Sequence, residues 1–543
     1  MTESVPQSAW VPFRSHAFTL LWCATIASNI GTWTHDVGAG WLMATLNPTP
    51  TTVSLVQAAT TLPVFLFAIT AGAVSDLVDR RKLLIGINIL MAATAGSLAF
   101  LTAIDVVTPL LLILLTFLMG TGTAFVAPTW QAIVPSLVPR SALQPAIALN
   151  SLGINISRAI GPALAGFLIV SVGLYAPFTV NALSFIGIVV ALLFWKPVRS
   201  ETSALPREHL FGALRAGLRY AGHSTPLRST LLRGGAFFLF ASAYWALLPL
   251  IGKVLLGGDA TFYGFLVGSI GAGAVTGALL LPRLRKRLQP DAMVRAGTVG
   301  TTVVLLLFAL FPEKSVAIGA SFLAGLSWIL VLTTLNASAQ TALPEWVRGR
   351  GLSIYITVFF GSMAAGSLLW GQLANFVGIP TALMISAVGI LVLMIVTRNA
   401  HLGQGEQMDL APSMHWPPPI TTDTDAKDRG PVMTMITYTV SPAAQREFIG
   451  QMSLLAEARK RLGAYAWGLM QDAAAANQFI EYFFEGSWID HLRHHERVSG
   501  EDQIIQNKIL ALLGENNAPV VRHLLGIGRS FDFPSSAMSE VSQ

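Results

Sequence analysis

Two charged residues, Asp36 and Arg158, stand inside long apolar stretches that run from about residue 17 to 45 and from about 142 to 171. A charged side chain at such a position costs roughly 2.5–3.5 kcal/mol, so it normally faces a partner or a polar cavity. If both stretches are helices that start on the same side of a membrane, the two residues differ in depth by roughly 5 Å. We therefore predict that they pair, directly or through water, in at least one conformation.

Such a pair is able to exchange protons. When it opens, Asp36 can take up and release a proton and thereby couple the movement of another solute to proton entry. Two other interpretations remain open: the pair is purely structural, or Asp36 already lies at the outer interface of the membrane.

Further polar residues lie in the apolar stretches and are accompanied by aromatic ones. Aromatic rings with a few polar groups suit a cavity for an amphipathic or aromatic small molecule. Many aromatic residues in such stretches nevertheless serve packing or the membrane interface. The candidate cavity residues are Trp33, Trp130, Gln131, Asn150, Asn155, Tyr244, Trp245, Asn336 and Gln340.

Two glycine-containing motifs add to these candidates. The first is the loop GAVSDLVDRRK at residues 72–82, in which Gly72 permits close helix approach and an acidic group precedes a basic run. Its candidate gating residues are Gly72, Asp76, Asp79, Arg80 and Arg81. The second lies in the stretch around Arg158, where a Gly-Pro pair bends a helix and further glycines permit close packing. Its members are Gly153, Gly161, Pro162 and Gly166.

The C-terminal region contains the one pair of histidines with metal-ligand spacing. His491 and His495 stand four residues apart and so share a helix face. No third ligand is evident from the sequence, so we expect a solvated helix face and no metal site. No nucleophile–base arrangement stands out either, so no catalytic residue is assigned.

The amino-acid composition indicates which class of protein positions these candidate residues. Of 543 residues, 53% are hydrophobic and 11% charged, whereas soluble domains are about one quarter charged. The chain is therefore a polytopic membrane protein, and its single cysteine, Cys23, excludes an internal disulfide. The net charge of +6 suggests basic membrane-flanking loops rather than nucleic-acid binding.

Twelve apolar stretches are long enough to span a membrane. They split six plus six around the gap at residues 197–228, which holds a basic amphipathic segment expected at the membrane surface. Lys and Arg lie on one side of the membrane in twenty cases and on the other in two, which predicts that both termini are cytoplasmic. The start of the chain lacks signal-peptide features, so the first helix is expected to be an uncleaved span.

The two halves share a weak internal repeat. At one offset of 209 residues, Gln131, Pro135 and Phe167 align with Gln340, Pro344 and Phe376, as do four further identical pairs. Repeated six-helix halves place a transport site near the midplane between them. The predicted domains are the halves 1–196 and 229–400, the central cytoplasmic loop 197–228, a linker 401–430, a soluble domain 431–530 and a tail 531–543.

The soluble domain is predicted from its pattern of strands and helices. Strands are expected at 431–440, 464–471, 477–485 and 519–526, and helices at 441–462, 487–498 and 501–513, with Ser441 as the first N-cap. A β-α-β-β-α-β order is the ferredoxin-like split βαβ arrangement.

Residues 1–400 resemble the major facilitator superfamily, particularly its transmembrane secretion effector branch, which includes the enterobactin exporter. The resemblance rests on residues 31–42, 72–82, 127–140 and 148–166. The loop matches the signature G-x-x-x-D-x-x-G-R-R, with Asp79 in place of the second glycine, and implies a gate latch. The fifth helix resembles the antiporter motif that accompanies export, with a single Gly166 where the motif has paired glycines.

The C-terminal domain resembles the antibiotic-biosynthesis-monooxygenase-like dimeric α+β barrel, through the segments around Trp467, 479–488 and 491–497. Related tails occur on some members of this exporter branch. The resemblance leaves two interpretations open: the domain binds or oxidises an aromatic metabolite, or it dimerises or regulates.

Together these features predict an all-α polytopic membrane protein with twelve transmembrane helices in two six-helix halves, plus a small C-terminal α+β ferredoxin-like domain. We expect an exporter of a small siderophore- or drug-like molecule in the inner cell membrane, working by alternating access and proton antiport. No ATP-binding motif is present, so the proton motive force is the expected energy source and no cofactor is expected. The alternatives are a membrane-tethered monooxygenase-like enzyme, or a regulatory or scaffold protein acting through its C-terminal domain.

Overall fold

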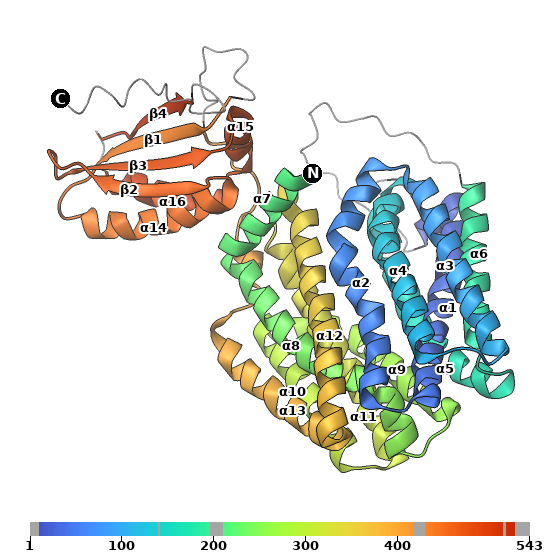
Figure 1. Ribbon diagram of the computed structural model, residues 1–543. Coiled ribbons are helices and arrows are strands. Elements are labelled where there is room, and N and C mark those ends of the chain that lie inside the picture. Colours follow the sequence, from blue (N-terminus) through green and yellow to red (C-terminus); the bar gives the residue numbers. More distant parts are fainter. Residues whose placement is uncertain (1–9, 140–141, 196–209, 417–428, 514–516, 527–543) are drawn as a thin grey trace, which may run out of the picture. The chain divides into compact units, whose positions relative to one another are not determined.

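The chain forms two compact units, which Figure 1 draws as helices and strands. The structure is a computed structural model and describes residues 10–139, 142–195, 210–416, 429–513 and 517–526. Unit 1 comprises residues 1–207, 229–339 and 352–403. Unit 2 comprises residues 208–228, 340–351 and 404–543.

Unit 1 is a bundle of long helices. In its first half they are α1 (His16–Leu46), α2 (Pro50–Leu77), α3 (Arg80–Ala103), α4 (Pro109–Leu137), α5 (Leu143–Ser171) and α6 (Ala176–Phe194). In its second half they are α8 (Thr225–Leu250, continued by a π-helical turn at Ile251–Leu255), α9 (Ala260–Arg285), α10 (Pro290–Leu310), α11 (Lys314–Thr341), α12 (Arg348–Val377) and α13 (Ile379–Val396).

Eleven helices of the described ranges are long and apolar enough to cross a membrane. The twelfth, α1, has 31 residues and packs against α5 and α6 in the same bundle. At about 1.5 Å per residue, α1 exceeds the roughly 30 Å of a bilayer core. The predicted twelve-helix, two-half architecture is therefore confirmed.

Local sequence explains where these helices begin. Proline occupies the first or second position of α2, α4, α6, α10 and α13, where its missing N–H is no loss. Polar side chains also cap several starts, including those of α2 and α4, by accepting a backbone N–H. These N-cap residues are Ser15, Thr49, Asp79, Thr108 and Asp259.

Because the helices alternate in direction, their connections gather at two ends of unit 1. We call one the basic end: α1 begins there, α13 ends there, and the α2–α3, α4–α5 and α9–α10 connections lie there. The other is the far end. The basic end carries Arg80, Arg81, Lys82, Arg283, Arg285, Lys286, Arg287 and Arg398.

The two halves of unit 1 meet through backbone contacts at the far end. α5 packs on α9, where a Cβ built on Gly264 would lie 2.9 Å from the Cα of Gly166. Thr51 at the start of α2 donates a hydrogen bond to Gln372 of α12 (3.1 Å), and Lys253 donates to the carbonyl oxygen of Ala44 (2.9 Å). These contacts between the halves thus lie away from the basic end.

Unit 2 contains a four-stranded antiparallel sheet in the order β2-β3-β1-β4. Its strands are β1 (Val432–Thr439), β2 (Ala466–Gln471), β3 (Gln478–Glu485) and β4 (Val520–Leu525). Its helices are α14 (Gln445–Leu462), α15 (Trp488–Arg497) and α16 (Gly500–Ala511), and α14 and α16 lie along one face of the sheet (Figure 1). This strand order agrees with the predicted ferredoxin-like topology.

Alternation along the strands builds the core of unit 2. Every second residue of β1 and of β3 is buried. The buried side packs against α14, which contributes Phe448, Met452 and Leu455. The start of α14 differs from prediction: it begins at Gln445 with Ala444 as N-cap, because residues 442–444 form a turn, so the prediction of Ser441 as the cap was wrong.

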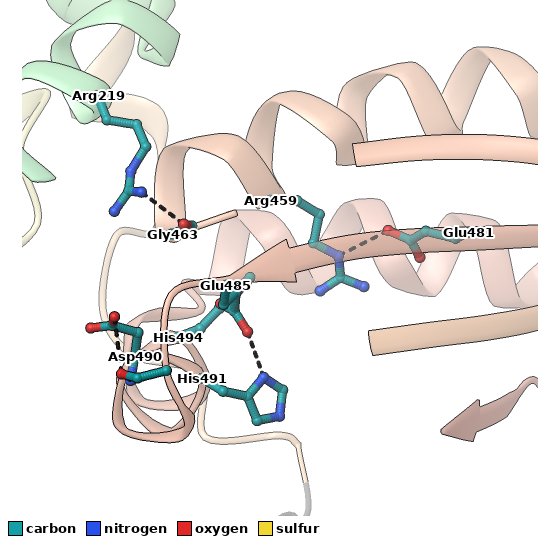
Figure 2. Close-up of polar contacts among 9 residues, drawn as sticks. Arg219, Arg459, Gly463, Glu481, Glu485, Asp490, His491 and His494 are labelled. Atoms are coloured by element: carbon teal, nitrogen blue, oxygen red, sulfur yellow. Dashed lines mark hydrogen bonds and ion pairs between the residues drawn. The ribbon is translucent and has the colours of Figure 1, made fainter. Parts of the chain in front are cut away.

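Unit 2 also takes in two segments from elsewhere in the sequence, α7 (Leu210–His223) and residues 340–351 with the 3-10 turn Glu345–Val347. α7 packs against α14. Arg219 donates to the carbonyl oxygen of Gly463 at 2.7 Å (Figure 2), and the His223 Nδ1 and Glu457 Oε2 atoms are 2.8 Å apart. The basic amphipathic segment expected at the membrane surface thus has a protein partner for one of its faces.

A buried carboxylate organises the interior of unit 2. Glu481 is fully buried and accepts hydrogen bonds from Arg459 Nε (3.0 Å, Figure 2), Trp467 Nε1 (3.0 Å) and the Tyr438 hydroxyl (2.8 Å). Burial by itself would raise the pKa of Glu481, but the Arg459 guanidinium and these hydrogen bonds lower it below its ordinary value. β1, β2, β3 and α14 are thereby joined through one side chain.

Glu481→Gln should destabilise unit 2 by about 3–5 kcal/mol, because it leaves the buried Arg459 without a counter-charge. The measurement is the urea dependence of proteolysis within residues 431–525 of the full-length protein. Glu496→Gln, at an exposed position of α15, is the matched control and should change little. Equal effects of the two substitutions would contradict the role given to Glu481.

Unit 2 should also lose stability in acid. A carboxyl group with a lowered pKa contributes stability that is present above its unfolded value of about 4.5 and is lost as the pH falls through its folded value. Proteolytic susceptibility of residues 431–525 should therefore rise as the pH falls below about 4.5, and this acid dependence should weaken in Glu481→Gln. An unchanged acid profile in the variant would exclude Glu481 as the titrating group.

Candidate functional site

The two intramembrane charges of unit 1 are not joined in this conformation. No ion pair between Asp36 and Arg158 occurs in the described structure. The guanidinium carbon of Arg158 lies 5.4 Å from the ring centroid of Trp33, and the group is close enough to Tyr244 of α8 to interact electrostatically. Asp36 is instead within electrostatic range of Tyr263 of α9. Their pairing in another conformation stays a prediction.

Some buried polar atoms at and near Arg158 have no hydrogen-bond partner among the described residues. They are Arg158 Nε, Tyr244 Oη and Trp245 Nε1. These residues come from α5 and α8, and so from both halves of unit 1. Leaving a buried polar group unpaired costs about 1–3 kcal/mol, so such groups are usually satisfied by something. A bound polar molecule would satisfy them.

Aromatic rings surround the same region. Tyr244 is fully buried and its ring lies 5.6 Å from that of Trp245. Trp245 in turn contacts Trp328 of α11 edge-on at 5.5 Å. Trp33 and Tyr244 therefore lie near Arg158, and Trp245 lies beside Tyr244. That these residues line a substrate cavity stays a prediction.

The other predicted cavity residues lie nearer the basic ends of their helices. Trp130 Nε1 donates to Asn150 Oδ1 at 3.3 Å, which ties α4 to α5. Gln131, Asn336 and Gln340 are exposed. The side chain of Asn155 lies outside the described residues.

The predicted gating loop ties helices together by side-chain contacts. Asp79, which replaces the second glycine of the signature, caps α3 by accepting from Lys82 N at 3.0 Å. Arg80 donates to Ser75 O (3.3 Å), and Arg81 donates to Leu192 O (2.7 Å) at the end of α6. Among the described residues, a Cβ on Gly72 would meet nothing within 4 Å, so close helix approach at this glycine is not seen there. The Asp76 side chain is outside the described residues.

The motif glycines of α5 face two different helices. A Cβ on Gly153 would lie 2.9 Å from the Ile26 side chain, and one on Gly161 would collide with Trp33, so both glycines face α1. Gly166 faces α9, because its Cβ would lie 3.0 Å from Ala260 O. The carbonyl oxygen of Pro162 also contacts α9, at 2.9 Å from a Cβ on Gly264. The motif therefore sets both the packing within the first half and its contact with the second.

Unit 2 encloses a second candidate site, a cavity of about 690 Å³ between the sheet and its helices. This volume is in the range of small-molecule sites. Its walls are largely apolar and aromatic and include Ile436, Leu455, Phe483 and Ile509. These four residues also belong to the hydrophobic core of unit 2, so the cavity adjoins the packed core.

Residues 404–416, predicted as part of a linker, help to form this cavity. His415 Nε2 and Trp416 Nε1 both bind Gln506 Oε1, at 2.9 and 2.8 Å. The guanidinium of Arg459 lies 4.8 Å from the Trp416 ring. His415 and Trp416 at the end of this segment therefore pack against the rest of unit 2.

Two histidines of α15 are buried and His495 is partly buried, which contradicts the expected solvated helix face. His491 is 1% exposed and His494 is 0% exposed. Both donate from Nδ1 to Glu485 at 2.6 Å, and Figure 2 shows the His491 contact. The sequence also did not reveal that His523 of β4 lies beside them. Burial followed by the neighbouring histidines lowers the pKa of His495 to about 3, and burial lowers that of His523 to about 4.

Comparisons with known proteins place the chain in a family. The family model described as transmembrane secretion effector matches residues 7–531. The Staphyloferrin A transporter of Staphylococcus aureus is 25% identical over 379 residues, which is 68% of this chain and 92% of that protein. The enterobactin exporter EntS of Escherichia coli K12 is 25% identical over 63% of this chain and 82% of its own length.

Solved structures show the same fold at low sequence identity. An auto-inhibited POT family peptide transporter is 11% identical, with a TM-score of 0.58 over 71% of this chain and 96% of that one. A bacterial homologue of the lysosomal transporter Spinster, solved in an inward-facing, unoccupied conformation, is 15% identical, with a TM-score of 0.54 over 72% and 97%. With a family match that covers nearly the whole sequence and a fold shared with membrane transporters, this chain belongs to the transmembrane secretion effector family.

Proposed function

We propose that this protein exports a small amphipathic or aromatic molecule, siderophore- or drug-like in character, by proton antiport and alternating access. The observation that carries the proposal is the environment of Arg158. This charged group of α5 lies between Trp33 of α1 and Tyr244 of α8, with buried unpaired polar atoms contributed by both halves. An anionic or polar aromatic solute would supply the missing partners.

The relatives support the direction and the class of substrate. One is named a transporter of staphyloferrin A and another an exporter of enterobactin. The antiporter-like motif of α5 supports export as well, and its glycines are in close contact with α1 and α9. We therefore infer a secreted metabolite of siderophore type as the first substrate class to test.

The contacts between the halves support an alternating-access cycle. If the basic end faces the cytoplasm, as the Lys and Arg distribution predicts, then the far end faces outward. The far end is closed by α5 on α9 and by α2 on α12, which is the arrangement expected of an inward-facing state. In the proposed cycle, this contact opens while the basic end closes.

Proton coupling is assigned to Asp36. In this conformation Asp36 is near Tyr263 of α9 and is not paired with Arg158. Protonation would remove the charge that favours a partner, so the carboxyl group can shift between the two environments as the halves move. The ionised Asp36 carboxylate and an anionic substrate would then compete for the Arg158 guanidinium, so protonation of Asp36 and binding of substrate at Arg158 become linked.

A second candidate function concerns unit 2. Its cavity of about 690 Å³ favours binding of a small molecule, in a regulatory or a monooxygenase-like role. A regulatory role needs only binding, whereas oxidation also needs a reactive group. Metabolite binding that alters export, without substrate-dependent oxygen uptake by the full-length protein, would favour regulation.

Asp36→Asn should abolish proton-driven export, because an amide cannot carry the proton. We expect at least a tenfold loss of enterobactin flux, equivalent to about 1.4 kcal/mol, in proteoliposomes with an imposed proton gradient. Asp105→Asn, in the α3–α4 connection, is the matched control and should transport normally, since asparagine tolerates its positive φ of 54°. Undiminished proton-driven flux through Asp36→Asn would remove Asp36 from the mechanism.

Gly264→Ala should slow export several-fold, because the added methyl would lie 2.9 Å from both the Gly166 Cα and the Pro162 carbonyl oxygen and so hold the far end apart. Gly268→Ala is the matched control one turn along α9, where the new Cβ would lie 3.8 Å from Ala163 Cβ. The same flux assay compares them. If both variants transport alike, close approach of α5 and α9 is not part of the cycle.

A deletion strain tests the substrate class. Cells lacking the gene should accumulate a siderophore-like metabolite inside, and complementation should reverse the accumulation. The measurement is untargeted mass spectrometry of cell extracts and medium from the two strains. Equal intracellular and secreted metabolites would argue against export of an endogenous product.

A further inference from the structure

Three histidines of unit 2 converge at one end of its cavity. His491 and His495 come from α15 and His523 from β4, and one ring nitrogen of each lies within 4.8 Å of the others. All three residues line the cavity. The transport function proposed above does not use them.

The hydrogen bonds of His491 leave a ring nitrogen available. Its Nδ1 donates to the buried carboxylate of Glu485 at 2.6 Å, so the lone pair is on Nε2. That Nε2 atom is buried and has no hydrogen-bond partner, and the residue is only 1% exposed. A histidine oriented by a carboxylate through one nitrogen, with the other nitrogen unpaired, is the usual arrangement of a metal-ligating imidazole.

The neighbouring histidines present nitrogens in the same place. His495 Nδ1 is also buried without a partner. The ring centroid of His491 lies 4.7 Å from that of His495 and 4.7 Å from that of His523. Trp488 packs on His491 at 5.2 Å and on His523 at 6.0 Å, so the cluster has a rigid aromatic neighbour. Packing explains why these rings are close, but it does not explain the unpaired nitrogens.

We propose that His491, His495 and His523 bind one divalent first-row transition-metal ion, with Zn²⁺ as the best match. Imidazole ligands suit zinc, copper, iron and nickel, whereas calcium and magnesium prefer oxygen. Three protein ligands leave a tetrahedral ion one further position. Because the three histidines line the cavity, that position is available to water or to an oxygen donor of a molecule bound there. The proposal does not depend on the transport function.

Glu485 is the positioning residue of this site. Its carboxylate oxygens accept from His491 Nδ1 and from His494 Nδ1, so it fixes the ring of one ligand without touching the ion. Removal of such a carboxylate partner typically weakens metal affinity by about 10–100-fold. The site thus predicts a graded series: loss of a ligand should weaken binding more than loss of Glu485.

The test is Zn²⁺ titration of the full-length protein in detergent, purified with a tag that contains no histidine and stripped of metal with a chelator. Calorimetry should show one saturable Zn²⁺ per chain. We expect His523→Gln and His495→Gln each to weaken binding by more than about 100-fold and Glu485→Gln by about 10–100-fold. His223→Gln, whose imidazole contacts Glu457 of α14 outside the cluster, is the matched control and should bind normally.

Two readouts keep the test decisive if a variant folds poorly. Co²⁺ in place of Zn²⁺ should give the ligand-field absorption of a tetrahedral nitrogen site in the wild type and in His223→Gln. Zn²⁺ should also raise the resistance of residues 431–525 to proteolysis, since a ligand that binds only the folded state stabilises it. The proposal is overturned if the wild type shows no saturable binding, or if His523→Gln and His495→Gln bind Zn²⁺ as tightly as His223→Gln.

Discussion

The cost of burying a charge without a partner governs both units of this protein. In unit 2, Glu481 is fully buried and satisfied by Arg459, Trp467 and Tyr438, so it holds strands and a helix together. In unit 1, Arg158 is placed between helices of the two halves, yet its Nε has no partner. A buried charge whose hydrogen bonds are satisfied supports structure, whereas the unpaired Arg158 Nε is the feature on which the proposed substrate site rests.

Hydrophobic length and periodicity were enough to predict the helices of unit 1 and the strand order of unit 2. The spans follow from apolar runs about 20 residues long, and the sheet follows from alternation along β1 and β3. Local chemistry was less predictable. Ser441 is a residue type that commonly caps helices, but the turn at 442–444 delays the start of α14. Asp79, which departs from the family signature, caps α3.

The full residue sets of the candidate sites could be identified only from the tertiary structure. The sequence placed His491 and His495 on one helix face, but only folding brings His523 of β4 beside them and buries that face under Trp488. Likewise, depth along a helix suggested that Asp36 and Arg158 could meet, but helix rotation sets which neighbours they face: Arg158 has Trp33, and Asp36 has Tyr263. The sequence predicts how deep a residue lies in the membrane and what kind of group it carries. Which neighbours its side chain faces depends on how the helices pack.

The contact of Gly166 with Gly264 bears on how fast α5 and α9 could separate. Where α5 and α9 touch, the surfaces are backbone against backbone, since neither residue has a side chain. Interlocked side chains would have to change rotamers before two helices could separate, and each such change adds to the activation barrier. A glycine contact lacks that requirement, so in the proposed alternating-access cycle it would add no such barrier to separation of the halves. The rate at which the far end opens would then be set by how strongly the remaining polar contacts, such as Lys253 to the Ala44 carbonyl, hold it shut.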